Sequence, residues 1–131
     1  MRFEDIAPCE LGVVLWNMRS QRYAVLVARF GPPVCAINIQ YLDGDADRIH
    51  GCRIEEFKMG ILTKGTLLKE CASKKRVVLT ADSKGPDILV YDLESSKKRK
   101  ARLVIQEGEQ VCAAFVVAPP PKETVARETP S

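Results

Sequence analysis

Apolar residues recur along the chain in short runs that are typical of β-strands. Residues 11–16 (LGVVLW) are continuously apolar, and residues 22–30 (RYAVLVARF) form a second such run after a polar turn. Two runs so close together predict the strands of a hairpin. A third run, residues 34–42, alternates between an apolar face and a face that carries Asn38 and Gln40. We expect the face with the amide groups to be solvated.

The rest of the chain predicts further strands and one helix. Residues 63–73 carry Leu67, Leu68 and Cys71 at helical spacing, which predicts a short amphipathic helix. A basic cluster at residues 74–76 follows it, where a helix dipole favours cations. Further strands are expected over residues 48–58, with a bulge at Gly51, and over 76–81, 88–93, 103–106 and 111–117.

This order of elements predicts a mainly β fold. We expect a small antiparallel (split) β-barrel with one or two short helices. The runs around Trp16, Val27 and Val78 are apolar over several consecutive residues, which predicts strands buried on both faces. A second subunit would supply that burial, so we expect a homodimer. Residues 1–118 form one barrel domain, and residues 119–131 form a Pro-rich polar tail that we expect to be flexible.

Composition narrows the chemistry. The formal net charge of +3 permits an anionic ligand, but a duplex-DNA binder would carry a stronger basic excess. His50 is the only histidine, and the five cysteines show no metal-ligand spacing, so we expect no metal site. The chain shows no signal-peptide pattern and no apolar run long enough to span a membrane. We therefore expect a cytoplasmic protein without membrane contact.

Thr63, Lys64 and Thr66 stand where a loop is expected to become the helix. The first turn of a helix leaves backbone N–H groups without intrahelical partners and carries partial positive charge. Hydroxyl groups and a lysine at that point suit a phosphate. An ordinary N-cap formed by Thr63 or Thr66 would explain the same residues without a ligand.

The layout around this segment resembles the FMN-binding split-barrel superfamily, which includes pyridoxamine-phosphate-oxidase-like and flavin-reductase-like proteins. The likeness rests on the Gly-Pro-Pro turn before residues 34–37, the TKGTLL segment and the KRVVL strand. It implies that Thr63, Lys64 and Thr66 hold the phosphate of FMN. It also implies that Val34 and Asn38 face the flavin ring, and that Arg48 or Lys75 completes the phosphate clamp.

Two functions remain open from the sequence. The resemblance implies a flavin-dependent oxidoreductase that acts on a small substrate or a nicotinamide cofactor. The alternative is a non-catalytic β-barrel that binds single-stranded nucleic acid or a protein partner. The basic run of residues 97–102 and the cluster at 74–76 favour this alternative, although lysines on a solvated edge strand would explain the run as well. The aromatic residues available for base stacking are Tyr23, Phe30, Tyr41 and Tyr91.

Overall fold

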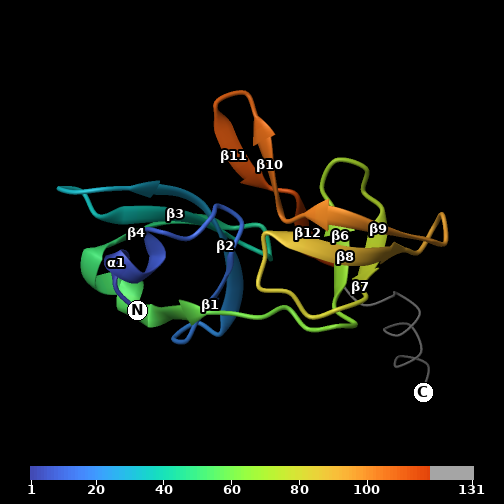
Figure 1. The fold of residues 1–131 in the computed structure, drawn as a ribbon, viewed down its shortest axis with the longest axis horizontal. Coiled ribbons are helices and arrows are strands. Elements are labelled where there is room, and N and C mark those ends of the chain that lie inside the picture. The colour runs from blue at the N-terminus through green and yellow to red at the C-terminus, as the bar shows by residue number, and fades with distance from the viewer. Residues whose placement is uncertain (119–131) are drawn as a thin grey trace, which may run out of the picture.

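The computed structural model describes residues 1–118 and confirms a mainly β fold with antiparallel sheets and few short helices. Figure 1 shows two sheets side by side along the long axis, with a two-stranded hairpin standing out between them. Residues 119–131, predicted to form a flexible tail, lie outside the described residues. The prediction of a single domain over residues 1–118 stays a prediction.

The first sheet has the strand order β4-β3-β2-β1-β5. Its β1 and β2 form the predicted hairpin, with Val14 opposite Val25 and Trp16 opposite Tyr23. Two short helices accompany this sheet. The elements are α1 (Phe3–Ile6), β1 (Val14–Asn17), β2 (Arg22–Phe30), β3 (Ala36–Tyr41), β4 (Ala46–His50), the 3-10 helix η1 (Gly51–Glu56) and β5 (Phe57–Met59).

The second sheet has the strand order β12-β6-β7-β8-β9. Four of its strands follow one another in the chain as an antiparallel meander, and β12 returns to pair with β6. The hairpin β10–β11 is a separate two-stranded ribbon. The elements are β6 (Leu67–Glu70), β7 (Arg76–Leu79), β8 (Asp87–Asp92), β9 (Lys97–Arg102), β10 (Val104–Glu107), β11 (Gln110–Ala113) and β12 (Phe115–Val117).

Two apolar cores hold these layers together. One core packs Val14 and Val25 of the first sheet against the second sheet, including Leu68, Val77 and Val90. The other core covers the opposite face of the first sheet, where Leu15 and its neighbours meet α1 and η1. The chain itself therefore supplies the two-sided burial around β1 and β2, for which the sequence suggested a second subunit. Homodimer formation stays a prediction without that argument.

Two predicted elements are wrong. Residues 63–73 form no helix: residues 67–70 are strand β6, and Leu67 and Leu68 point to opposite faces and pair with Val78 and Val77. Gly65 adopts φ +93°, which is outside the helical region. The strand expected over residues 48–58 is also interrupted, because residues 51–56 turn into η1 and bury Ile54 in the second core.

Candidate functional site

Three backbone N–H groups of the loop of residues 63–66 already have hydrogen-bond partners within the chain. The amide of Lys64 donates to Asp82 Oδ1 at 2.7 Å, and the amide of Gly65 donates to the carbonyl of Leu79 at 2.8 Å. The amide and hydroxyl of Thr66 both donate to the carbonyl of Thr63, at 3.1 and 2.7 Å. These hydrogen bonds occupy the amides of Lys64, Gly65 and Thr66, which would otherwise be open to a phosphate, and the carboxylate of Asp82 adds negative charge to the loop.

The other residues assigned to FMN lie on different elements. Asn38 of β3 and Arg48 of β4 are together: Arg48 Nε donates to Asn38 Oδ1 at 2.9 Å, and both line a hollow of about 410 Å³. Thr63 instead borders a hollow of about 390 Å³ beside Trp16. Val34 is exposed in the β2–β3 turn, and Lys75 is exposed in the turn before β7.

Within one chain, the residues assigned to FMN therefore lie at separate hollows. The structure brings Asn38 and Arg48 together, but it places Thr63, Lys64 and Thr66 in a loop that leads into the second sheet. The helix on which the phosphate argument depended is absent from this segment of the described chain. FMN binding stays a prediction that gains no support from this geometry.

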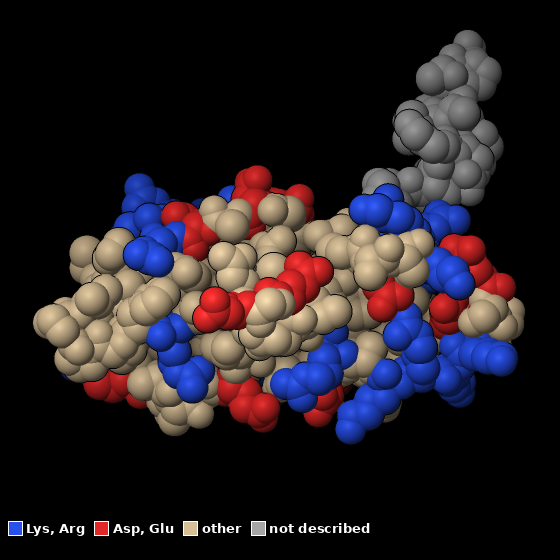
Figure 2. Space-filling model, turned by 90° about the horizontal axis from the view of Figure 1, so that it is seen from above, with Lys and Arg blue, Asp and Glu red and all other residues tan. Residues whose placement is uncertain are grey.

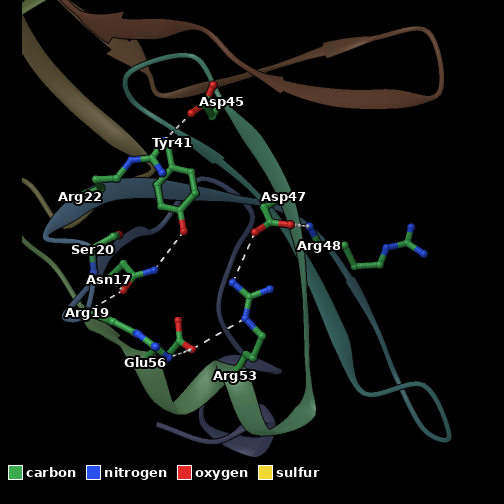
Figure 3. Close-up of polar contacts among 10 residues, drawn as sticks. All are labelled: Asn17, Arg19, Ser20, Arg22, Tyr41, Asp45, Asp47, Arg48, Arg53 and Glu56. Carbon is green, nitrogen blue, oxygen red and sulfur yellow. Dashed lines mark hydrogen bonds and ion pairs between the residues drawn. The ribbon is translucent and has the colours of Figure 1, made fainter.

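A cluster of polar side chains lies at the end of β1 and β2 (Figure 3). Asn17 Nδ2 donates to the buried Tyr41 hydroxyl at 3.0 Å, and the Arg22 guanidinium stacks 3.7 Å above the Tyr41 ring. Arg22 also pairs with Asp43 and Asp45, each at 2.7 Å. Partial burial opposes the charge of Arg22, but these two carboxylates outweigh it and raise the pKa of Arg22.

The same cluster connects η1 to the sheet. Arg53 of η1 pairs with Asp47 at 3.5 Å and with Glu56 at 3.7 Å, and Arg19 reaches the same Glu56 oxygen at 3.7 Å. These guanidinium groups are all engaged with carboxylates of this chain. The ion pairs of this cluster connect structural elements of the chain, and this role accounts for the cluster without a ligand.

The side of the second sheet that faces away from the core carries a different kind of surface, which we call the outer face. Strand residues alternate between the two sides of a sheet. In β8, Ile88 and Val90 are buried in the first core, whereas Leu89 is 49% exposed and Tyr91 is half-buried. Val78 of β7 lies directly beside Tyr91. The outer face is defined by Leu67, Lys69, Arg76, Val78, Leu89, Tyr91, Lys98, Lys100 and Val116.

The register arranges these residues into an apolar centre with a basic border. One row across the sheet runs from Leu67 through Val78 and Tyr91 to Lys98. The next row ends with Leu89 beside Lys100. In Figure 2, Lys and Arg side chains gather at the end of the molecule that the second sheet forms. The apolar centre is thus partly exposed to solvent, most of all at Leu89, and is bordered by basic side chains.

Not every cation of the basic run is available to a partner. Arg99 points to the core side and donates to Glu70 at 3.1 Å, and Arg102 pairs with Asp87 at 3.2 Å and Glu10 at 3.7 Å. The four basic residues of the outer face form no ion pair within residues 1–118; these are Lys69, Arg76, Lys98 and Lys100.

The turn between β8 and β9 is held by one carboxylate. Asp92 accepts hydrogen bonds from the amides of Glu94 and Ser95 at 3.0 and 3.2 Å. The bond from Ser95, followed by that from Glu94, lowers the pKa of Asp92. These two hydrogen bonds close the tight turn that aligns β9 beside β8, and they are strongest when Asp92 is ionised.

The cysteines offer no metal site. All five are free thiols, and the described residues contain no group of three or more side chains that could hold a metal ion. Cys71 and Cys112 line a hollow of about 170 Å³ at the base of the β10–β11 hairpin. Burial, followed by a hydrogen bond with Glu107, raises the pKa of the Cys112 thiol.

Comparison with known proteins adds no family assignment. No protein-family model, curated protein or solved structure matches this chain. Among residues 1–118, no helix has the length and apolar character that crossing a membrane requires. The cytoplasmic location stays a prediction.

Sequence reasoning singled out the basic run but missed the outer face beside it. The alternation was readable in residues 87–92, where Leu89 and Tyr91 stand between residues of the opposite face. Which side of the strand faces the core depends on the pairing of β7 with β8, and the sequence alone does not reveal that pairing.

Proposed function

We propose that the chain is a non-catalytic binding module that holds a protein partner on the outer face of the second sheet. The observation that carries this proposal is the combination of an apolar centre, in which Leu89 is exposed and its aliphatic neighbours are half-buried, with four basic residues at the border. An apolar centre with a polar, charged border is the usual anatomy of a protein interface. The partner that fits has apolar side chains flanked by carboxylates.

The composition of the centre favours a protein over single-stranded nucleic acid. Base stacking depends on aromatic side chains. The outer face offers one, Tyr91, which is half-buried, whereas Leu67, Val78 and Leu89 are aliphatic. Aliphatic side chains pack well against the apolar residues of a protein but give a base no ring to stack on.

The border also argues against a symmetric pair of these chains on this face. A two-fold contact would set the same patch against itself. Lys98 and Lys100 of one copy would then lie close to the basic residues of the other, and like charges in close contact are unfavourable. The predicted homodimer, if it forms, would use another surface.

A capped synthetic peptide that alternates glutamate with valine, Ac-EVEVEVE-NH2, tests this proposal by isothermal titration calorimetry at about physiological ionic strength. We expect saturable binding that weakens at least about tenfold in Leu89→Asp, because that change puts a carboxylate beside Lys100, where the glutamates of the peptide would bind. Met18→Asp is the matched control, because Met18 is 45% exposed and belongs to the β1–β2 turn.

Two comparator ligands make the test decisive. A twelve-nucleotide oligothymidylate should bind weakly and lose its binding steeply as salt is raised, because it meets only surface charge. FMN should leave the dialysed protein colourless. The proposal is refuted if the peptide does not bind, if Leu89→Asp and Met18→Asp bind it equally, or if the oligonucleotide binds more tightly than the peptide.

A further inference from the structure

Strand β9 is one of the two edge strands of the second sheet among the described residues, the other being β12. In an antiparallel ladder, residue pairs alternate between those that exchange backbone hydrogen bonds and those that do not. Two hydrogen bonds fix this alternation. The amide of Leu103 donates to the carbonyl of Pro86 at 2.8 Å, which makes Leu103 a bonded position and therefore Ala101 and Arg99 as well.

The neighbouring ladder gives the same answer independently. The amide of Thr80 donates to the carbonyl of Leu89 at 2.9 Å, so the backbone groups of Leu89 are directed at β7. Lys100 lies opposite Leu89, so these two residues form a pair that does not exchange backbone hydrogen bonds. The same holds for Lys98 opposite Tyr91.

The backbone N–H and C=O groups of Lys98 and Lys100 consequently point away from β8, toward the open edge of the sheet. The side chains of these two residues lie on the outer face. The positions that offer unused main-chain hydrogen bonds are thus the same positions that carry the unpaired ammonium groups. Arg102 has the same parity, but its guanidinium already pairs with Asp87.

We propose that β9 accepts an extended acidic segment of a protein partner as an added strand. This inference rests on the proposed function and specifies how the partner is held. Two residues of the added strand, two positions apart, would exchange hydrogen bonds with Lys98 and Lys100. Their side chains would fall on the outer face beside the ammonium groups, where carboxylates are favoured. The segment therefore carries acidic residues at alternate positions, and the residues between them fall on the opposite side of the sheet.

Lysines on an edge strand have another explanation, which is that they prevent strand pairing with other chains. That explanation depends on charge alone, and it predicts that the outward N–H and C=O groups of β9 form no hydrogen bonds with a partner. The two explanations differ in what happens at the amide hydrogens of β9, and this difference can be measured.

Amide hydrogen exchange, followed by NMR on the full chain with and without the alternating peptide, provides the measurement. The Lys98 and Lys100 amides should exchange rapidly in the protein alone and at least about tenfold more slowly with saturating peptide, because an amide that enters a ladder is protected. The Arg99 amide is already bonded to β8, so its exchange rate should change little. It serves as an internal reference.

A pair of substitutions at one position separates charge from backbone. Lys100→Ala removes the ammonium group and should weaken peptide binding by about threefold, as for one exposed ion pair. Lys100→Pro removes the same charge and also the outward N–H, and should weaken binding by about a further fivefold. Proline is tolerated at an edge position whose N–H faces solvent, so both variants should unfold at similar urea concentrations.

The outcomes separate this inference from the function on which it rests. Slower exchange at Lys98 and Lys100, together with weaker binding by Lys100→Pro than by Lys100→Ala, supports strand addition. Equal binding by the two variants with unchanged exchange rates overturns it. If Leu89→Asp still weakens binding at least about tenfold in that case, the outer face remains the binding surface and only the added strand is lost. Failure of the peptide to bind at all refutes both.

Discussion

Replacing two neighbouring residues of β8 by threonine tests whether the outer face is open. Val90 is fully buried in the first core, whereas Leu89 is 49% exposed on the opposite side of the same strand. Threonine matches valine in shape and suits a strand, so the change at Val90 leaves the packing nearly intact and introduces a buried hydroxyl. The change at Leu89 trims an aliphatic side chain that is already half in water.

The expected costs follow from this difference in burial. A hydroxyl buried without a partner costs about 1–3 kcal/mol, so Val90→Thr should lower the free energy of unfolding by about 2 kcal/mol. Leu89→Thr removes two side-chain carbons; full burial of each is worth about 0.8 kcal/mol and half-burial about half of that, so the change should cost at most about 1 kcal/mol.

Urea denaturation followed by tryptophan fluorescence measures both values, because Trp16 is the only tryptophan and its strand β1 contributes residues to both apolar cores. With a slope of about 1.5 kcal/mol/M, Val90→Thr should lower the midpoint by more than about 1 M and Leu89→Thr by less than about 0.7 M. Equal losses would mean that Leu89 is packed against other parts of the chain. The reasoning about an open apolar centre would then fail.

Three further predictions concern other parts of the fold. Asp92→Asn should lower the free energy of unfolding at neutral pH, because the folded-state pKa of Asp92 is lowered. The difference in free energy from wild type should shrink as pH falls below about 4 and vanish below that lowered pKa, which urea titrations at several pH values would show. Gly12→Ala should lower the free energy of unfolding by about 2 kcal/mol or more, because Gly12 has φ +101° and an added Cβ would lie 2.6 Å from Pro86 Cβ. A fall in melting temperature of less than about 2 °C would contradict this. The Cys112 thiol, with its raised pKa, should react with iodoacetamide at pH 8 more slowly than the exposed Cys52, as peptide mass spectrometry would show. Equal rates would contradict the burial of the Cys112 thiol.

The strands were predictable where one local signal dominated. Residues 22–30 form β2 with the predicted bounds, and the hairpin of β1 and β2 follows from two apolar runs around a short polar turn. The alternation of residues 34–42 correctly separated the buried Ile37 and Ile39 from Asn38 and Gln40. The amide of Gln40 is not simply solvated, however, because its Oε1 accepts a hydrogen bond from the Ala113 amide of the projecting hairpin.

The failure at residues 63–73 has a physical cause. Three apolar residues over five positions fit a short helix and a short strand about equally, and propensity is a weak guide at that length. Pairing with β7 decides between them, because the strand buries Leu68 against Val77. The partner strand lies several residues away in the chain, so a local pattern could not supply this information.

The candidate surface was only half visible for the same reason. The sequence shows the basic run, but it does not show that Arg99 and Arg102 are engaged by Glu70 and Asp87. Nor does it show that Lys98 and Lys100 share a face with Leu89. Those facts depend on register, which is set by the β8–β9 turn and by the core beneath the sheet.

Backbone amide chemical shifts, recorded as the alternating glutamate–valine peptide is added, test the central claim most directly. We expect saturable changes at Val78, Leu89, Tyr91, Lys98 and Lys100, with none at residues 63–66, because binding is assigned to the outer face and edge of the second sheet. An unchanged second sheet, or saturable changes at residues 63–66 when FMN is added in place of the peptide, would contradict it.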